Sequence, residues 1–319
     1  TEDTGLIYPK SDRASDVLSA LMKAIHSYPN THILTSTPVS KVSHTKEAFN
    51  IYSPQLNHHI RSSKLIVATG GLSYPETGSS GEGFLWCKNL GHSVTPLIPS
   101  LVPFICKDSW IKQLRGITLE HAQFSWHTPS TTHYSPAGML LFTHFGLSGP
   151  LVLNASLELS SMVKRAPLSI NLDCIAHIDA SELSSFLNNA IKVKPNQSIG
   201  KVLSPLLPNR FIEVVLQIVD IDPAKHMNQI TRSDKQVIIT SLKKLPLTIE
   251  GTLPIEKAYV TKGGVSLNEI NSHTLESKIV KGLYFAGEII DCSGISGGYN
   301  LQQAFSTGYL AGYYASKNI

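Results

Sequence analysis

The stretch Gly282-Leu-Tyr-Phe-Ala-Gly-Glu288, followed by Gly297-Gly-Tyr-Asn-Leu301, decides how the rest of this sequence is interpreted. It predicts a short apolar strand that ends in a glycine and a carboxylate, and a carboxylate there can accept hydrogen bonds from ligand hydroxyls. The second glycine pair leads into a predicted C-terminal helix, whose free N–H groups favour negative charge. These features predict a cradle for a cofactor. The alternative is a glycine-rich helix start with Glu288 exposed.

A second glycine turn follows the apolar run Lys64-Leu-Ile-Val-Ala68. An unbroken apolar run is typical of a buried parallel strand, and this one leads directly into Thr69, Gly70 and Gly71. Glycine has no Cβ, so a ligand can approach the backbone closely, and ligands of open α/β sheets bind at the carboxyl ends of strands. The turn therefore predicts a nucleotide contact, with an ordinary tight turn as the alternative.

The composition suits a folded protein of the reducing cytoplasm. The 319 residues are 42% apolar and 16% charged, which allows two domains and argues against disorder. The net charge of +4 is mild and no run of Lys and Arg exceeds two residues, so a nucleic-acid partner is not expected. No apolar stretch approaches the ~20 residues of a membrane span, and the polar N-terminus does not resemble a signal peptide. The cysteines lie far apart without a C-x-x-C pair, which argues against zinc and suits a reducing compartment: Cys87, Cys106, Cys174 and Cys292.

The periodicity along the chain predicts one domain interrupted by another. Residues 1–95 and 255–319 form the first domain, and residues 96–254 form a mixed β and helical insertion that begins in a proline-rich linker. Helical spacing is found first at Ser15–Ser27 and again beyond Asp179. The predicted helices of the insertion are Ser181–Ala190, Ile199–Leu206, Arg210–Val219 and Ser233–Leu245, and the early predicted strands are His32–Thr35, Val39–Val42 and Ala48–Tyr52.

Several stretches together resemble one family, the HI0933-like bacterial NAD(P)/FAD-dependent oxidoreductases. The matching stretches are Ala68–Gly83, Leu141–Pro150, Ala258–Val265 and Gly282–Gly312, and the stretch from Gly5 to Asp16 matches more loosely. More distantly, Thr261–Gly264 and Gly81–Gly83 look like pieces of fumarate-reductase-type flavoproteins. The resemblance implies an α/β fold of the two-dinucleotide-binding-domain flavoprotein type, with a Rossmann-like FAD domain and an inserted substrate domain.

The resemblance also implies roles for individual residues around FAD. Thr69, Gly70 and Gly71 would lie near the pyrophosphate and ribose, and Val39, in its strand, would meet adenine through its backbone. Glu288 would hold ribityl hydroxyls, and Asn300 and Leu301 would present N–H groups to the flavin. The remaining cofactor contacts implied are Gly81, Gly83, Gly264, Gly287, Gly297, Gly298 and Tyr299.

One departure from the family pattern is the lack of its opening G-x-G-x-x-G turn and the acidic residue that follows it. Gly78-Ser-Ser-Gly-Glu-Gly83 has the wrong order and position for this turn. About the first hundred residues of the family pattern have no counterpart, so the main clamp on the pyrophosphate is missing from this sequence. The hypothesis is that the chain is a truncated form, a fragment or a degenerate gene product that binds FAD poorly or not at all.

Candidate catalytic groups lie in and beside the insertion. His144 can transfer protons near neutral pH, or it can make a structural hydrogen bond. Thr261 and Lys262 are candidates to approach the isoalloxazine, although Lys262 can equally point to solvent. Arg115, expected in a strand, is a candidate for binding an anionic substrate or a surface residue. Cys292 is expected to be a small filler, and the remaining histidines, including His58 and His59, are expected at the surface.

The sequence thus supports a flavin-dependent oxidoreductase that moves a hydride between FAD and a small organic substrate, with NAD(P)H as the reductant. The alternative is a non-catalytic remnant that acts as a binding or interaction module, which the missing phosphate-binding turn favours. A nucleic-acid-modifying flavoprotein has only the mild positive charge in its support.

Overall fold

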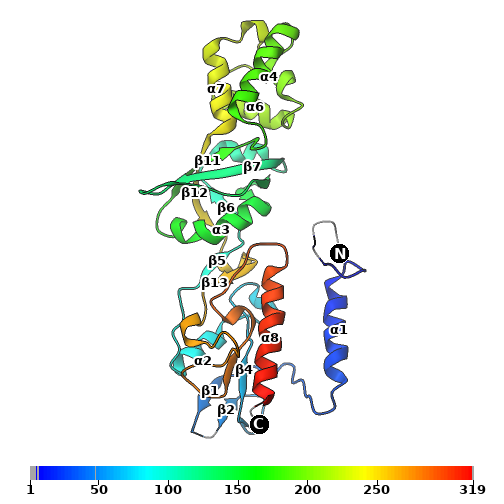
Figure 1. The fold of residues 1–319 in the computed structure, drawn as a ribbon, viewed down its shortest axis with the longest axis vertical. Helices are drawn as coiled ribbons and strands as arrows, with labels where there is room; N and C mark the ends of the chain where they lie inside the picture. Colours follow the sequence, from blue (N-terminus) through cyan, green and yellow to red (C-terminus); the bar gives the residue numbers. More distant parts are fainter. Residues whose placement is uncertain (1–4, 6, 47, 318–319) are drawn as a thin grey trace. The chain divides into compact units, whose positions relative to one another are not determined.

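The structure is a computed structural model that describes residues 5, 7–46 and 48–317 (Figure 1). The chain divides into two compact units, each with its own internal contacts. Unit 1 comprises residues up to 70, residues 81–95 and residues from 264 onward, and unit 2 comprises residues 71–80 and 96–263. The predicted assignment of residues 1–95 and 255–319 to an FAD-binding domain and of 96–254 to a substrate domain stays a prediction.

Unit 1 is built around a parallel pair of strands, β4 (Leu65–Val67) and β14 (Leu283–Phe285). All three residues of β14 are buried, as expected of a parallel strand covered on both faces. The long helix α8 (Tyr299–Lys317) packs along both strands (Figure 1). The unit is completed by α1 (Ala14–His26), α2 (Glu82–Asn89) and an antiparallel sheet of β1 (Lys41–His44), β2 (Phe49–Tyr52) and β3 (Ile60–Ser62).

The N-terminal part of unit 1 confirms one prediction and contradicts another. The predicted helix is present as α1, although none of its side chains is buried. The predicted strand His32–Thr35 is absent, and Val39 precedes β1 instead of lying in a strand. His32–Thr35 is exposed and has no partner strand among the described residues, and apolar composition alone cannot hold a strand without cross-strand contacts.

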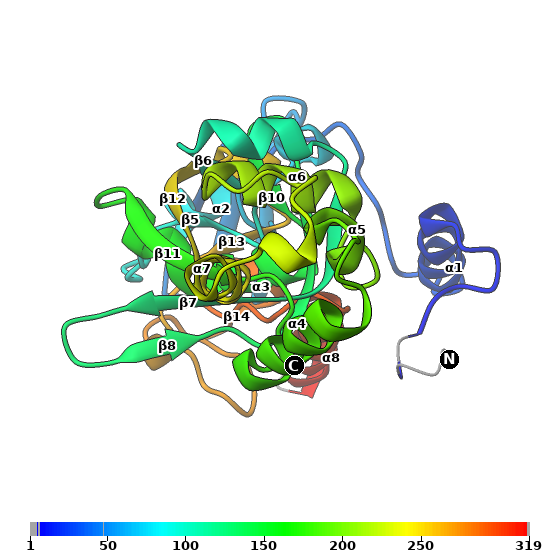
Figure 2. The same cartoon turned by 90° about the horizontal axis from the view of Figure 1, so that it is seen from above.

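Unit 2 contains a closed antiparallel β-barrel of six strands. The strand order is β11-β12-β6-β10-β9-β7, and a further pairing of β11 with β7 closes it. β8 extends this sheet beyond β7 as a projecting hairpin (Figure 2). The barrel strands are β6 (Phe104–Cys106), β7 (Thr118–His127), β9 (Gly138–Phe142), β10 (Gly146–Ser148), β11 (Leu168–Asp173) and β12 (Leu245–Thr252), and β8 is Thr132–Tyr134.

The barrel interior follows the period of two that strands impose. In β12, Leu245, Leu247 and Ile249 are buried, whereas Pro246 and Glu250 are exposed. Side chains of successive strand residues point to opposite faces, so the apolar set fills the barrel and the polar set faces solvent. The helix α3 (Pro150–Val163) packs against the barrel, and its first residue is a proline, a favoured residue at the first helical position. A separate strand pair joins β5 (Ile98–Ser100) to β13 (Val260–Lys262).

Four helices between β11 and β12 form the part of unit 2 that we call the helical lobe, residues 180–244 (Figure 2). They are α4 (Ala180–Val193), α5 (Ile199–Leu203), α6 (Asn209–Ile218) and α7 (Arg232–Lys243), and they confirm the helical period of the sequence. Capping boxes begin α4 at Asp179 and α7 at Thr231. α5 ends earlier than predicted, at Leu203, because Pro205 has no backbone N–H to continue the helical hydrogen bonds.

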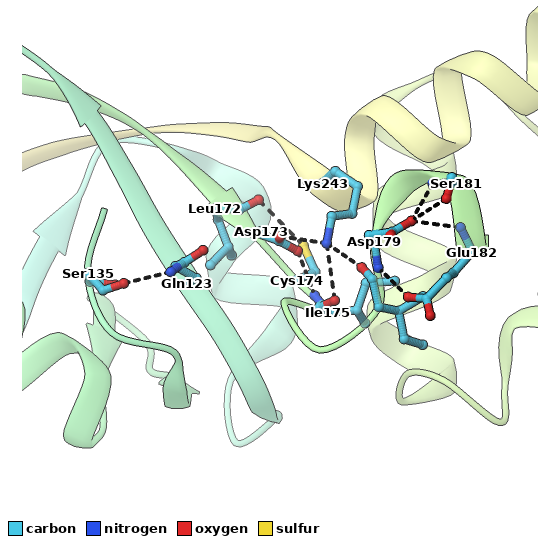
Figure 3. A network of polar contacts seen from close by, with 11 residues as sticks. Gln123, Ser135, Leu172, Asp173, Cys174, Ile175, Asp179, Ser181, Glu182 and Lys243 are labelled. Carbon is cyan, nitrogen blue, oxygen red and sulfur yellow. Dashed lines mark hydrogen bonds and ion pairs between the residues drawn. The ribbon is translucent and has the colours of Figure 1, made fainter. Parts of the chain in front are cut away.

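A lysine fastens the helical lobe to the barrel (Figure 3). The Nζ atom of Lys243, at the end of α7, lies 2.7 Å from Oδ2 of Asp173, at the end of β11. It also donates hydrogen bonds to the carbonyl oxygens of Ile178 (2.6 Å) and Ile175 (3.2 Å). Because both charged side chains are largely buried, the ion pair fixes α7 against the loop that follows β11. Complete burial also raises the pKa of the neighbouring Cys174 thiol well above its ordinary value, so this thiol stays protonated.

Candidate functional site

The two parallel strands of unit 1 end at the same edge. Phe285 pairs with Val67, and the N–H of Ala286 donates to the carbonyl of Val67 (3.1 Å). Thr69 and Gly287 each follow their strand by two residues, so both lie at the carboxyl edge of the pair. In α/β sheets this edge is where ligands bind, and the structure therefore brings together the two glycine turns that the sequence singled out.

The N-terminus of α2 closes on Thr69 at this edge. A Cβ added to Gly83 would lie 2.9 Å from the Cβ of Thr69, so only glycine permits this approach. The hydroxyl oxygen of Thr69 is buried and has no hydrogen-bond partner among the described residues. Buried hydroxyls in native proteins almost always have a partner. The Thr69 hydroxyl fills the space left by the absent Gly83 side chain, and its unmet hydrogen-bonding capacity at this edge is what a bound polar ligand would satisfy.

α8 holds the turn after β14. Gly287 has a φ of 73°, which a glycine adopts without strain. Its N–H donates to Oγ1 of Thr307 (2.8 Å), and its carbonyl accepts from Nε2 of Gln303 (3.2 Å). These two bonds fix the position of the half-buried Glu288, the predicted ribityl ligand.

Gly264 lies where two backbones cross behind this turn. Its N–H donates to Oγ1 of Thr95 (3.0 Å), and the next residue, Val265, donates to the carbonyl of Ile289 (2.8 Å). A Cβ on Gly264 would lie 2.5 Å from the Ile289 carbonyl oxygen. Gly264 therefore supports the turn through close backbone packing.

The start of α8 is shaped by Asn300. Its Oδ1 accepts from the N–H of Gly294 (2.8 Å), and its Nδ2 donates to the Gly294 carbonyl (3.0 Å). Gly297 and Gly298 have φ values of 107° and 90°, so glycine is required for the chain to turn into the helix. The neighbouring Tyr299 and Leu301 are exposed.

Most of the predicted cofactor residues fall into three groups. The first group lies at the carboxyl edge or the start of α2 and comprises Thr69, Gly70, Gly81, Gly83, Gly287 and Glu288. The second is Gly264, behind the edge, and the third is residues 297–301 at the start of α8. Val39 lies half-buried before β1. Gly71 falls in unit 2. The roles assigned to all of these residues stay predictions.

The catalytic candidates lie in unit 2, and two of them are engaged by the protein itself. Thr261 is buried, and its Oγ1 accepts from the N–H of Leu72 (2.8 Å). Lys262 does not extend freely into solvent, because its Nζ donates to the carbonyl of Leu157 in α3 (2.6 Å). His144 is exposed on the turn between β9 and β10, and its ring makes no hydrogen bond to the described residues. Of the three candidates, His144 is the one whose side chain is not held by a hydrogen bond to the described residues and is therefore available for proton transfer.

Two smaller expectations were wrong. Arg115 follows a 3-10 helix, Ser109–Leu114, and does not lie in a strand. Cys292 is exposed, so it does not fill a gap in the core. Both residues lie outside regular helices and strands, where hydrophobic periodicity gives no signal.

The expectation of surface histidines was wrong for His92, which is buried in unit 1. Its Nδ1 lies 3.0 Å from Oε2 of Glu269, and its Nε2 lies 2.9 Å from Oγ of Ser277. The Ser277 oxygen already accepts from the N–H groups of Ile279 (3.0 Å) and Val280 (2.8 Å), so its own hydrogen points to Nε2. His92 is therefore neutral with its proton on Nδ1, and burial lowers its pKa.

The order serine, histidine, glutamate resembles a hydrolase triad, but the geometry argues for a structural role. A nucleophile needs an exposed oxygen with a free lone pair. Ser277 is buried and its oxygen accepts two backbone N–H groups. The three side chains instead join the end of α2 to the chain leading into β14. Nothing in the sequence spacing signals this contact, because the three residues come from separate segments.

Unit 1, with its parallel pair, glycine turns and covering helix, has a Rossmann-like arrangement, and unit 2 contains an antiparallel barrel. The chain matches the HI0933-like protein Rossmann domain family over residues 1–314. It therefore belongs to this family, as the sequence motifs indicated.

Curated relatives share this match at moderate identity. The chain is 28% identical over 314 residues to the 3-dehydro-bile acid delta(4,6)-reductase of Clostridium scindens, covering 98% of this chain and 76% of that protein. It is 36% identical over 246 residues to the ribosomal RNA dihydrouridine synthase of Escherichia coli K12, covering 77% and 59%. The corresponding Haemophilus influenzae enzyme is 33% identical over 249 residues, covering 77% and 58%. The match thus spans less than two thirds of either RNA-modifying relative.

These relatives bear on the expected partners. Two of them carry a name that refers to ribosomal RNA, so the expectation of no nucleic-acid partner loses its support.

Among the described residues, no helix combines the length and the apolar character that a bilayer crossing requires.

Proposed function

We propose that this chain belongs to an FAD-dependent reductase of the two-dinucleotide-binding-domain type, with unit 2 contributing the substrate domain. The observation that carries the proposal is the unpartnered, buried hydroxyl of Thr69 beside Gly83, at the edge where β4 and β14 end. Membership of the HI0933-like family and the names of the relatives support the same conclusion.

The residues at this edge suit a dinucleotide. Glu288 would accept hydrogen bonds from ribityl hydroxyls, and the Thr69 hydroxyl would bond to a polar group of the cofactor. Gly287 keeps the backbone of its turn accessible, because the nearest atom to a Cβ added there would be 3.8 Å away. When bound, FAD supplies the hydride chemistry that no amino-acid side chain provides. The sequence lacks the G-x-G-x-x-G turn, so we propose that this chain holds the flavin half better than the pyrophosphate.

The relatives' names point to a class of reaction. One name specifies a Δ4,6-reductase of a 3-oxo steroid acid and the other the formation of dihydrouridine, and both describe adding hydrogen to a ring double bond conjugated to a carbonyl. We propose the same class here, with NAD(P)H as the source of the hydride. Such a reduction also needs a proton, and His144 is our candidate donor because its imidazole is exposed and makes no hydrogen bond to the described residues.

A comparison of FAD with riboflavin tests this proposal. We expect the fluorescence of both flavins to be quenched when the chain is added. Their dissociation constants should differ by less than about tenfold, or about 1.4 kcal/mol, because a bound pyrophosphate would contribute more than that to the affinity for FAD. Glu288→Ala should weaken both by roughly tenfold, since a hydrogen bond to a charged group contributes about 1.5–3 kcal/mol. Glu120→Ala, an exposed carboxylate of β7, should change neither.

Two results would contradict it. If neither flavin binds at millimolar concentration, the alternative of a non-catalytic binding module is favoured. If the chain purifies yellow with stoichiometric FAD, it has a full pyrophosphate clamp that the sequence did not reveal.

A further inference from the structure

We propose that the helical lobe of unit 2 is a docking surface for RNA. Residues 180–244 contain nine Lys and Arg against five Asp and Glu, a formal charge of +4. The whole chain has 27 basic and 23 acidic residues, so the lobe alone accounts for its net charge and the remainder is neutral. A positive charge confined to one part of a fold is the electrostatic footprint of a polyanion site.

A pocket of about 620 Å³ opens within this lobe. It is lined by Lys194, Asn196, Gln197, Ser198, Lys201 and His226. Each of these side chains carries at least one hydrogen-bond donor, and none is acidic. A wall of donors with positive charge suits the phosphate and hydroxyl oxygens of a nucleotide, and the volume is within the range of ligand pockets.

The walls of the pocket are held by backbone hydrogen bonds. Ser198 and His226 form an antiparallel bridge. The N–H of Ile199 donates to the carbonyl of Lys225 (2.9 Å), and the N–H of Met227 donates to the carbonyl of Gln197 (2.9 Å). The loops before α5 and before α7 therefore form one rigid frame, which places side chains from both loops at fixed positions.

The lysines of the pocket have no protein partner among the described residues, whereas some other lysines of the lobe are paired. Lys225 pairs with Asp234 (2.7 Å) and Lys243 with Asp173 (2.7 Å). Among the described residues, the ammonium groups of Lys194 and Lys201 form no ion pair or hydrogen bond, and both side chains are exposed. Their charges are thus available to a ligand.

The pocket also contains an unsatisfied polar atom. The side-chain carbonyl oxygen of Gln197 is buried without a hydrogen-bond partner among the described residues. A buried acceptor of this kind requires a ligand or an ordered water to satisfy it. An RNA 2′-hydroxyl or base amine would provide the missing donor.

RNA explains the charge distribution better than a single small anion does. The excess positive charge is distributed over the whole lobe. Such a distribution suits RNA, because each of its phosphates that pairs with a protein cation releases bound counterions. Two relatives carry names that refer to ribosomal RNA. This inference names the substrate class of the reductase proposed above and in that respect rests on it, although RNA binding itself needs no flavin.

The test measures RNA affinity of the full 319-residue chain without flavin or reductant. Fluorescence anisotropy with a labelled RNA hairpin is recorded over a series of salt concentrations. The variant Lys194→Glu/Lys201→Glu is compared with Lys46→Glu/Lys88→Glu, which makes the same charge change at two exposed lysines of unit 1. Far-ultraviolet circular dichroism confirms that both variants are folded.

We expect the pocket variant to bind RNA at least about tenfold more weakly, and its salt slope to fall by about 1.4–1.8, because each phosphate contact contributes about 0.7–0.9. The control should retain wild-type binding within about twofold. Equal losses in both variants would overturn the proposal, because they would indicate a net-charge effect. No loss in the pocket variant, or equal wild-type affinity for RNA and for polyglutamate, would also overturn it. RNA binding without flavin binding would refute only the reductase.

Discussion

Replacing Gly264 by alanine should disrupt the carboxyl edge of unit 1 without affecting unit 2. The added Cβ would lie 2.5 Å from the Ile289 carbonyl oxygen and 2.8 Å from the Asp291 nitrogen. Both contacts are with backbone, so no side chain can move aside. Overpacking costs about 1–3 kcal/mol, and the φ of 153°, which L-residues rarely adopt, costs about 1–3 kcal/mol more. We expect unit 1 to lose about 2–6 kcal/mol, a large part of a typical domain stability.

Hydrogen exchange of backbone amides resolves the two units. In Gly264→Ala, peptides covering β14 should exchange at least about 25-fold faster than in the wild type, since tenfold corresponds to 1.4 kcal/mol. Peptides covering β11 should exchange unchanged. The control Gly308→Ala, in the middle of α8 with open space around it, should slow exchange slightly, because alanine favours a helix over glycine by about 1 kcal/mol. Wild-type exchange of β14 in Gly264→Ala would refute the argument.

Two further predictions concern charged contacts. Lys243→Met leaves Asp173 without its cation. We expect urea denaturation to show that unit 2 loses about 2–4 kcal/mol of its free energy of unfolding. This is less than the roughly 3–5 kcal/mol expected for a fully buried pair, because 15% of the Lys243 side chain and 18% of the Asp173 side chain are exposed. Lys244→Met, which is exposed, should change it by less than about 0.5 kcal/mol. Burial lowers the pKa of His92 below 6.5, so the unfolded state binds a proton first as the pH falls, and the stability of unit 1 should decrease below pH 6.5. His92→Gln should remove this dependence, and an unchanged pH profile in that variant would contradict the assignment.

Local patterns were sufficient to predict most of the regular structure. The helical period of the lobe acts within a few residues, and the observed helices follow it. The early strand expected at His32–Thr35 failed because a strand depends on a distant partner that local composition does not reveal. The barrel was not foreseen for the same reason: its closure pairs β11 with β7, about fifty residues apart in sequence.

The candidate site divides in the same way. Glycines and the carboxylate of the edge stand out in sequence because they follow apolar runs. The contact of Thr69 with Gly83 and the engagement of Lys262 by α3 arise from tertiary packing. His92 shows the limit most sharply, since Glu269 and Ser277 reach it from segments more than 170 residues away.

The positive charge of the lobe illustrates why counting along a sequence can mislead about partners. Runs of Lys and Arg never exceed two residues, and this argued against nucleic acid. Lys194 and Lys201 are seven residues apart, and His226 is a further twenty-five along the chain, yet all three line one pocket. Polyanions respond to the spatial density of charge within about a Debye length, ~10 Å at moderate salt, and not to adjacency in sequence. A mild net charge therefore carries little weight until the fold shows where the balancing carboxylates lie, and here they lie outside the pocket.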